Sequence, residues 1–276
     1  MRVLFIGDVV GDPGISFLEA HLPQLIERTR PDVVIANGEN ASVTGPASIS
    51  GFGITLGDLA RLQTGGVDVI TTGNHAWDGH EYEQVLASPG VLRPINQGRG
   101  GPGKGSLVWT AAHRRLGIIN VAGRTAIPSV DDYADAAEGQ LKDWGDEVDA
   151  VIVDMHAGHI EKQILAARLD GKVSVIVGTH THVPTRDAQI LPRGTGYVTD
   201  VGMVGPTGGV SGVDPDYFRE WSRRRVIPSR PFSLASGPIT FGAILAELNG
   251  FSARSIRRVG LHLDCFDSES YAKVTT

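Results

Sequence analysis

The sequence predicts an α/β fold, with a second, more antiparallel sheet contributed by the C-terminal third. Two observations lead to this prediction. Short apolar runs rich in β-branched residues recur through the first two thirds of the chain, and segments of helical character separate them. Such nearly continuous runs are typical of strands buried on both faces beneath layers of helices. Because no internal repeat, low-complexity tract or linker interrupts the pattern, we expect a single domain over residues 1–276.

The predicted elements of the first two thirds follow one another at short intervals. Six strands are expected at residues 3–6, 33–36, 67–71, 117–121, 150–153 and 173–177. Each of these runs is short and apolar and is followed by polar or glycine residues, which mark the end of a buried strand. Helical character is clearest at residues 15–29 and 53–64. Strands therefore alternate with helices, as in βαβ units.

The last third has a different pattern, in which short strands are joined by turns. The expected strands lie at residues 188–191, 196–199, 239–248 and 257–265. The pair Asn249-Gly250 favours a tight turn, so the last two of these strands should form a hairpin. The Gly- and Pro-rich residues 98–105 and residues 205–230 are expected to be the longest loops.

The composition is that of an ordinary globular chain and restricts the possible partners. The chain is 41% hydrophobic and 20% charged, and its net charge of -6 argues against broad binding of duplex nucleic acid. A small phosphorylated substrate stays open, because a metal ion can supply positive charge locally. The single cysteine, Cys265, fits a reducing compartment. With neither a signal peptide nor an apolar run of roughly 18 residues, we expect a cytoplasmic protein that does not contact membranes.

The histidine pair in Gly178-Thr179-His180-Thr181-His182 indicates a metal site. Histidines two residues apart cannot share one face of a helix, but just past the end of a strand both rings can point into one pocket. Neutral imidazole is the commonest protein ligand for transition metals. About a hundred residues upstream, Gly73-Asn74-His75 adds an amide oxygen and a titratable acid. These are the components of a hydrolytic metal centre.

Polar side chains follow five of the predicted strands at the point where each strand ends. Ligands of open α/β sheets bind outside the carboxyl ends of the strands, so we expect these side chains to meet at one edge. In chain order they are Asp8, Glu39, Asn40, Asn74, His75, His156, His180 and His182. Unrelated loop residues would not be expected to recur at the ends of successive strands.

The number of possible ligands favours two metal ions over one. A single ion in a hydrolytic site takes fewer protein ligands than this edge offers, whereas two ions that share Glu39 would each have about four. Imidazole, carboxylate and amide ligands suit Fe or Mn, and also Zn. Water that bridges two such ions loses its proton near neutral pH and can act as a nucleophile. The seven candidate ligands are Asp8, Glu39, Asn40, Asn74, His156, His180 and His182.

This ordered set of residues resembles the calcineurin-like metallophosphoesterase superfamily and, more narrowly, the YmdB-like bacterial phosphodiesterases. Residues 1–11, 73–78 and 178–185 and the pair Thr199-Asp200 carry the likeness, which covers nearly the whole chain. The resemblance implies a four-layer α-β-β-α sandwich of two mixed sheets flanked by helices. It also implies two metal sites: one is formed by Asp8, Glu39, Asn40 and His182, and the other by Glu39, Asn74, His156 and His180.

The resemblance further implies phosphodiesterase activity, with cyclic nucleotides such as 2',3'-cyclic AMP as the usual substrates, and a homo-oligomer. The expected mechanism is in-line attack by a metal-bridging hydroxide. His75 is not needed as a ligand, and its predicted role is that of the general acid that protonates the leaving alkoxide. Asp78, three residues further on, is expected to hold the tautomer of that imidazole. The run Arg223-Arg224-Arg225 is interpreted as a solvated face, with contact to a substrate phosphate or an RNA end as the alternative.

Two positions depart from the patterns of these families. The superfamily has a histidine two residues after its first aspartate, where this chain has Val10, and Asn40 is expected to take over as ligand. After His156, the usual acidic residue is missing at Gly158, and His159 adds an imidazole that we interpret as a rim or surface residue. This second departure could alter the pocket rim, the metal preference or contacts between subunits.

Other functions compete with the phosphodiesterase hypothesis. A phosphomonoesterase of the same superfamily would use the same ligands. A regulatory nucleotide- or phosphate-binding protein could retain metals with weak or no turnover. A Rossmann-type oxidoreductase is disfavoured, because the glycines after the first strand lack the Gly-x-Gly-x-x-Gly spacing.

Overall fold

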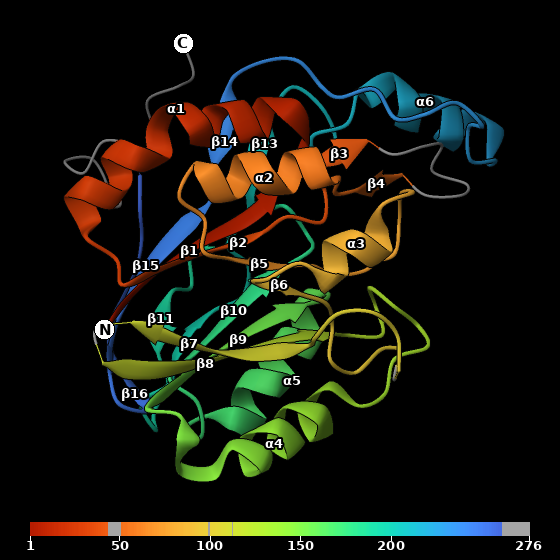
Figure 1. Cartoon of the computed structure of the whole chain (residues 1–276). Helices are drawn as coiled ribbons and strands as arrows, with labels where there is room; N and C mark the ends of the chain where they lie inside the picture. The colour runs from red at the N-terminus through yellow and green to blue at the C-terminus, as the bar shows by residue number, and fades with distance from the viewer. Residues whose placement is uncertain (44–50, 99, 112, 261–276) are drawn as a thin grey trace.

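The computed structural model describes residues 1–43, 51–98, 100–111 and 113–260. Over these residues the chain forms two large mixed sheets that stack face to face, with helices on the outer face of each (Figure 1). The four-layer α-β-β-α sandwich is therefore confirmed. Within the described ranges, no helix is long and apolar enough to cross a membrane.

The first sheet contains eight strands and is built around β1. Strands β13, β1, β2, β5 and β6 run parallel, β14 pairs antiparallel with β13, and β15 pairs antiparallel with β1 and β16. Helices α1, α2 and α3 pack on its outer face. The strands are β1 (Arg2–Val9), β2 (Val33–Asn37), β5 (Val69–Thr71), β6 (Val91–Leu92), β13 (Met203–Pro206), β14 (Ile239–Phe241), β15 (Ala243–Asn249) and β16 (Ser252–Arg258). The helices are α1 (Gly11–Thr29), α2 (Leu56–Thr64) and α3 (Tyr82–Ala87).

The second sheet has the order β11-β12-β10-β9-β8-β7. Its four central strands are parallel, and antiparallel strands close both edges. Helices α4 (Tyr133–Trp144) and α5 (His159–Leu169) cover its outer face. The strands are β7 (Ser106–Ala111), β8 (Arg114–Ala122), β9 (Ala150–His156), β10 (Val175–Thr179), β11 (Gln189–Ile190) and β12 (Gly196–Val198). Outside both sheets lie the short pair β3 (Ser42–Val43) and β4 (Phe52–Gly53), the 3-10 turn Gly145–Glu147 and the protruding helix α6 (Pro215–Arg224).

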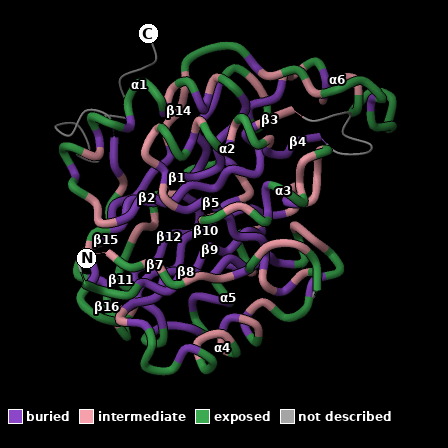
Figure 2. The backbone as a smooth tube through the Cα atoms, viewed as in Figure 1, coloured by how far each residue is buried: buried purple, intermediate pink, exposed green. Residues whose placement is uncertain are grey.

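Side chains of β1 show why the strand sequences are apolar without alternation. Leu4 and Ile6 point into the core beneath α1 and α2, whereas Val3 and Phe5 point into the core between the two sheets. Both faces of the strand are thus buried, as Figure 2 shows for the centre of the molecule. Removing apolar surface on both sides of each sheet is the main source of stability in such a layered fold.

The structure confirms the predicted early strands and corrects the organisation of the last third. Each predicted early strand is present, and β15 and β16 form the predicted hairpin next to Asn249-Gly250. The C-terminal strands do not build a separate sheet. They extend both existing sheets, because an apolar strand pattern identifies a strand without identifying its partner. Residues 239–248 form two strands that break at Gly242, and the loop expected at 205–230 contains α6. Residues 261–265 of the last predicted strand, Cys265 included, lie outside the described residues.

Candidate metal centre

The predicted site residues meet where the carboxyl ends of both sheets converge. Strands β1, β2 and β5 belong to the first sheet and β9 and β10 to the second, so the prediction of a single sheet edge was wrong. Two stacked sheets whose strands end at the same side place these residues together equally well. Asp8 and His156 also lie within the last residues of β1 and β9 rather than after them, because strand pairing continues past the apolar run.

The first group of side chains surrounds Nε2 of His156. Oε1 of Glu39 lies 2.7 Å from this atom, Oδ1 of Asn74 lies 3.1 Å from it, and Nδ1 of His180 lies 3.1 Å from it. His156 is fully buried, and Glu39 is 1% exposed. Four atoms with lone pairs thus converge on one small volume.

The opposite side of the His156 ring fixes its tautomer. The Thr179 hydroxyl donates to Oδ1 of Asp154 at 2.8 Å and lies 2.9 Å from Nδ1 of His156. Because the hydroxyl proton goes to Asp154, the histidine Nδ1–H donates to the hydroxyl oxygen. Nε2 is thereby directed at Glu39, to which it donates when the ring is charged and presents a lone pair when the ring is neutral. Hydrogen bonds of this kind orient metal-ligating histidines.

The second group of side chains surrounds Nε2 of His182. Oδ1 of Asn40 lies 3.2 Å from this nitrogen, and Oδ1 of Asp8 lies 3.7 Å from it. Nδ1 of His182 donates to the backbone oxygen of Ser211 at 3.0 Å, so Nε2 again presents a lone pair. Asp8 and Asn40 are buried, and His182 is 8% exposed. Three of the four residues expected around one of the two ions, namely Asp8, Asn40 and His182, thus lie together.

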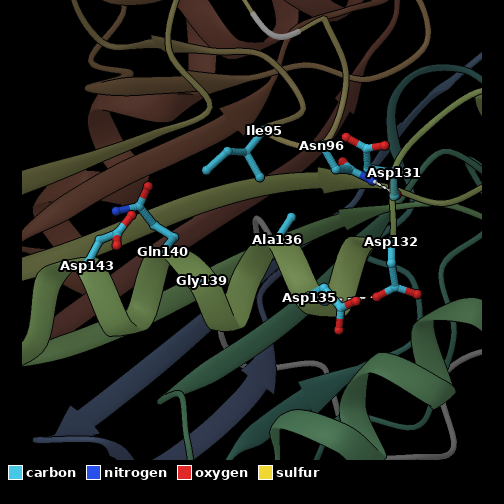
Figure 3. Close-up of a pocket in the computed structure, with 9 residues that line it drawn as sticks. All are labelled: Ile95, Asn96, Asp131, Asp132, Asp135, Ala136, Gly139, Gln140 and Asp143. Carbon is cyan, nitrogen blue, oxygen red and sulfur yellow. Dashed lines mark hydrogen bonds between the residues drawn. The ribbon is translucent and has the colours of Figure 1, made fainter.

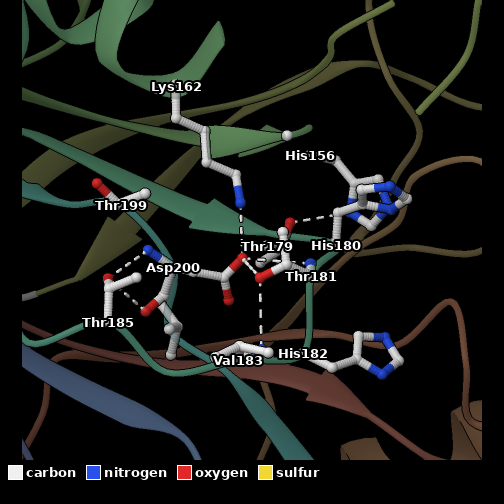
Figure 4. A network of polar contacts seen from close by, with 12 residues as sticks. His156, Lys162, Thr179, His180, Thr181, His182, Val183, Thr185, Thr199 and Asp200 are labelled. Atoms are coloured by element: carbon white, nitrogen blue, oxygen red, sulfur yellow. Dashed lines mark hydrogen bonds and ion pairs between the residues drawn. The ribbon is translucent and has the colours of Figure 1, made fainter. Parts of the chain in front are cut away.

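The loop after β10 directs the two histidines into different groups. His180 and His182 have φ angles of 95° and 63°, in the left-handed region that residues other than glycine rarely adopt. The resulting turn places the His180 ring beside His156 and leaves His182 apart from both (Figure 4). The two histidines thus lie in different groups, and their assignment to two different metal ions stays a prediction.

The electrostatics of the cluster depend strongly on burial. Burial raises the pKa of Asp8 well above its usual range. Burial also opposes ionisation of Glu39, but the charge of His156 and its hydrogen bond lower the pKa of this carboxyl to about 2. Burial lowers the pKa of His180 to about 3, and the nearby charge of His156 adds to this effect. His180 therefore stays neutral, as a metal-ligating imidazole must.

The donor set fits a transition-metal ion. Carboxylate, amide and imidazole acceptors converge here on one ring nitrogen, and buried acceptors are costly unless a donor or a positive charge satisfies them. A proton on His156 can serve only one of its three neighbours, whereas a metal ion can bind all of them. Glu39, His156 and His180 each offer a ligand atom within 4.8 Å of the others, which is compatible with a shared ion.

His75 lies beside this cluster and is oriented differently from Asn74. Its backbone N–H donates to Oε2 of Glu39 at 2.9 Å, and its Nδ1 lies 2.7 Å from Oδ2 of Asp78. The edge of the ring packs against Phe52, with the ring centroids 5.6 Å apart. The predicted contact between Asp78 and His75 is thus present. With Nδ1 donating to Asp78, Nε2 of His75 is left to hold or release a proton.

The departures from the family pattern have simple structural explanations. Val10 packs into an apolar cluster with Phe52, Met203 and Tyr217, so no side chain reaches the site from this position. The N–H of Gly158 donates to Thr125 at 2.6 Å, and a Cβ on Gly158 would lie 3.0 Å from the same oxygen. His159 is exposed at the start of α5, as expected for a rim or surface residue.

The arginine run of residues 223–225 is exposed at the end of α6. Arg224 forms an ion pair with Glu220 at 3.1 Å. The exposure agrees with the interpretation of a solvated face.

A hollow of about 420 Å³ lies beside α4 and contains none of the predicted site residues (Figure 3). Its polar lining is mainly acidic. Asp132 accepts hydrogen bonds from the N–H groups of Ala134 and Asp135 at the start of α4, and Asp135 pairs with Arg168. Negative charge at this place disfavours a phosphorylated ligand, so the histidine cluster is the better candidate for the functional site.

Gly73→Ala should displace His156, because a Cβ on Gly73 would lie 2.1 Å from Cδ2 of that ring. We expect overpacking to cost about 1–3 kcal/mol of unfolding free energy. Mn²⁺ affinity should fall about 10–100-fold, as it does when ligand orientation is lost. Gly139→Ala in α4 is the matched control, because its Cβ would meet no atom within 4 Å. Wild-type Mn²⁺ binding by Gly73→Ala, measured by calorimetry, would contradict this reading of the site.

The protein has a metallophosphoesterase fold. Two mixed sheets stack between helices, and imidazoles, amides and carboxylates gather where both sheets end. A family model described as YmdB-like protein matches residues 4–259, and the chain belongs to this family. The resemblance found in the sequence is confirmed.

Comparisons with individual proteins agree with this family. A 2',3'-cyclic-nucleotide 2'-phosphodiesterase from Bacillus subtilis is 37% identical over 261 residues, which cover 93% of this chain and 95% of the relative. A crystal structure of a hypothetical protein from Thermus thermophilus has a TM-score of 0.85 at 38% identity, covering 94% of this chain and 98% of that one. A novel phosphatase from Mycoplasma pneumoniae has a TM-score of 0.84 at 28% identity, covering 94% and 92%.

Proposed function

We propose that the protein is a metal-dependent phosphodiesterase that hydrolyses 2',3'-cyclic nucleotides. The observation that carries this proposal is the convergence of buried and partly buried acceptors on Nε2 of His156 and on Nε2 of His182. The Bacillus subtilis relative, named as a 2',3'-cyclic-nucleotide 2'-phosphodiesterase, supports the choice of substrate.

Two transition-metal ions, Fe or Mn, would be held by the two groups of side chains. Asp8, Asn40 and His182 would hold one ion, and Asn74, His156 and His180 would hold the other, with Glu39 shared between them. When bound, such ions lower the pKa of water toward neutrality and offset the charge that develops on phosphoryl oxygens. The protein orients the ligands through Thr179 and the Ser211 carbonyl, and it excludes water from the buried side of the cluster.

His75 is the proposed general acid. Asp78 accepts from Nδ1 at 2.7 Å, so the proton available for transfer is on Nε2. During hydrolysis of a cyclic phosphodiester, a water oxygen forms a bond to phosphorus and releases a proton to solvent, and the bond between phosphorus and one ribose oxygen breaks. The Nε2 proton passes to that oxygen, which leaves as a hydroxyl group, and His75 becomes neutral. Solvent then reprotonates the imidazole.

The substrate class is tested by comparing diesters with monoesters at equal enzyme concentration and saturating Mn²⁺. We expect kcat/KM to be higher for 2',3'-cyclic AMP and bis-p-nitrophenyl phosphate than for p-nitrophenyl phosphate. Faster turnover of the monoester would identify a phosphomonoesterase instead. Tight nucleotide binding without turnover of any ester by metal-loaded protein would point to a regulatory binding protein.

A further inference from the structure

A buried ion pair lies behind the loop that carries His180 and His182. The side chain of Lys162, on α5, is fully buried, and its Nζ donates to Oδ2 of Asp200 at 2.6 Å. Asp200, which follows β12, is fully buried as well. Gly178 provides space for the lysine, because a Cβ there would lie 2.5 Å from Cδ of Lys162. Burying two charges is costly, so a pair in this place calls for an explanation.

Asp200 fastens the loop at Thr181, the residue between the two histidines. Its Oδ2 accepts from the Thr181 hydroxyl at 2.7 Å and from the Thr181 N–H at 3.2 Å (Figure 4). Its Oδ1 accepts from the N–H of Gly202 at 2.8 Å. The main chain of Asp200 reaches the far end of the loop, where its N–H donates to the Thr185 hydroxyl at 2.9 Å and its carbonyl accepts from the Thr185 N–H at 3.0 Å.

The loop needs such an anchor because its backbone is unfavourable. His180 and His182 both adopt left-handed φ angles, and residues in this region keep their conformation only when their surroundings impose it. Thr181 lies between them, so its two hydrogen bonds to Asp200 hold the peptide that sets both ring directions. Loss of this contact would let the two imidazoles leave their groups.

Asp8 and Asp200 hold neighbouring N–H groups of the loop but lie in different surroundings. Both oxygens of Asp8 accept from the His180 N–H at 3.2 Å, and Oδ1 also faces the His182 imidazole. Asp200 instead faces Lys162. The charge of Asp200 is therefore offset within the protein, and this carboxylate can act as a fixed acceptor. Asp8 retains its place among the candidate metal ligands.

We propose that Lys162 and Asp200 are positioning residues, and that their buried ion pair sets the directions of His180 and His182 through Thr181. This inference rests on the proposed function, since it takes the histidine cluster to bind metal. Lys162 holds the Asp200 carboxylate in place, and this carboxylate in turn fixes Thr181 by two hydrogen bonds. Neither residue touches the reacting atoms.

The test measures binding of Mn²⁺ to metal-free full-length protein, from the loss of the electron paramagnetic resonance signal of the free ion. Thr181→Val removes the hydroxyl donor at nearly constant shape and leaves the ion pair intact. Lys162→Met removes the cation and keeps the apolar stem. Outer partners of metal ligands typically change affinity about 10–100-fold, and we expect a loss of this size in both variants.

Leu169→Ala is the control for lost stability. Leu169 is fully buried on α5 together with Lys162, and it packs in the core beneath the second sheet rather than on the histidine loop. We expect this variant to melt at a lower temperature and to keep wild-type affinity for Mn²⁺. If Lys162→Met does not fold, Thr181→Val and this control still decide the question.

Wild-type affinity in Thr181→Val, or in folded Lys162→Met, would overturn the proposal. An equal loss of affinity in Leu169→Ala would also overturn it, because the effect would then follow from lower stability alone. If the wild-type protein binds no Mn²⁺ and contains no transition metal as purified, the proposed function is refuted, and the positioning role is refuted with it.

Discussion

Glu39→Gln is expected to weaken metal binding strongly and to lower phosphodiesterase activity with it. Glu39 is almost fully buried, and its Oε1 lies 2.7 Å from Nε2 of His156. Glutamine preserves the shape and can still accept the N–H of His75, but it removes the negative charge at the centre of the cluster. Metal ions contribute several kcal/mol to hydrolysis, so we expect kcat/KM to fall by a factor on the order of 10³ or more.

This prediction has a thermodynamic counterpart that is independent of turnover. Mn²⁺ at a hundred times its dissociation constant should stabilise the wild-type protein by about 2.7 kcal/mol, visible as a higher Tm. Glu39→Gln should lose most of this gain. His159→Ala is the matched control and should behave as wild type, because His159 is exposed and lies only three residues after His156 in the sequence. A Glu39→Gln protein that keeps both the Mn²⁺-induced shift and its activity would contradict the assignment of Glu39 as a ligand.

His75→Ala is expected to slow hydrolysis without releasing the metals. The ring contacts Asp78 and Phe52, and only the backbone N–H of His75 reaches Glu39. Loss of a general acid typically lowers kcat by about 10²–10⁴-fold. The effect should be largest for 2',3'-cyclic AMP, whose leaving group is an alkoxide, and much smaller for bis-p-nitrophenyl phosphate, whose p-nitrophenolate leaves without a proton.

The dependence on the leaving group separates an acid from a structural residue. The measurement is kcat for both substrates with wild-type and His75→Ala protein at saturating Mn²⁺. Equal losses on both substrates would argue for a structural role of the ring, and an accompanying loss of Mn²⁺ affinity would argue for a ligand. No loss on the cyclic nucleotide would remove His75 from the mechanism.

The sequence was sufficient to predict which side chains would meet. Asp8, Asn74 and His180 each stand at the carboxyl end of an apolar run, and parallel strands bring such ends to the same side of a sheet. The apolar runs by themselves did not show which strands belong to which of the two sheets. Val3 and Ile118, for example, lie in different sheets and pack into the same core, but both sit in equally apolar runs.

The residues that orient the ligands were harder to recognise. Ser211 holds His182 through a backbone carbonyl, which no side-chain pattern can reveal. Asp200 follows a predicted strand, and the rule applied to the other strand ends would have selected it. Lys162 lies on the same helix face as Leu165 and Leu169. A charged residue within this apolar stripe was the one feature of the sequence that indicated a buried ion pair. Helix α6 was missed because Gly and Pro residues around it suggested a loop.

The central claim is that the two groups of side chains bind two metal ions, and elemental analysis of anaerobically purified protein tests it most directly. We expect two transition-metal ions per chain in the wild type, with Fe or Mn predominant, and fewer than two in His180→Ala and in His182→Ala. A wild-type protein that contains no transition metal, or variants that both retain two ions, would contradict the account.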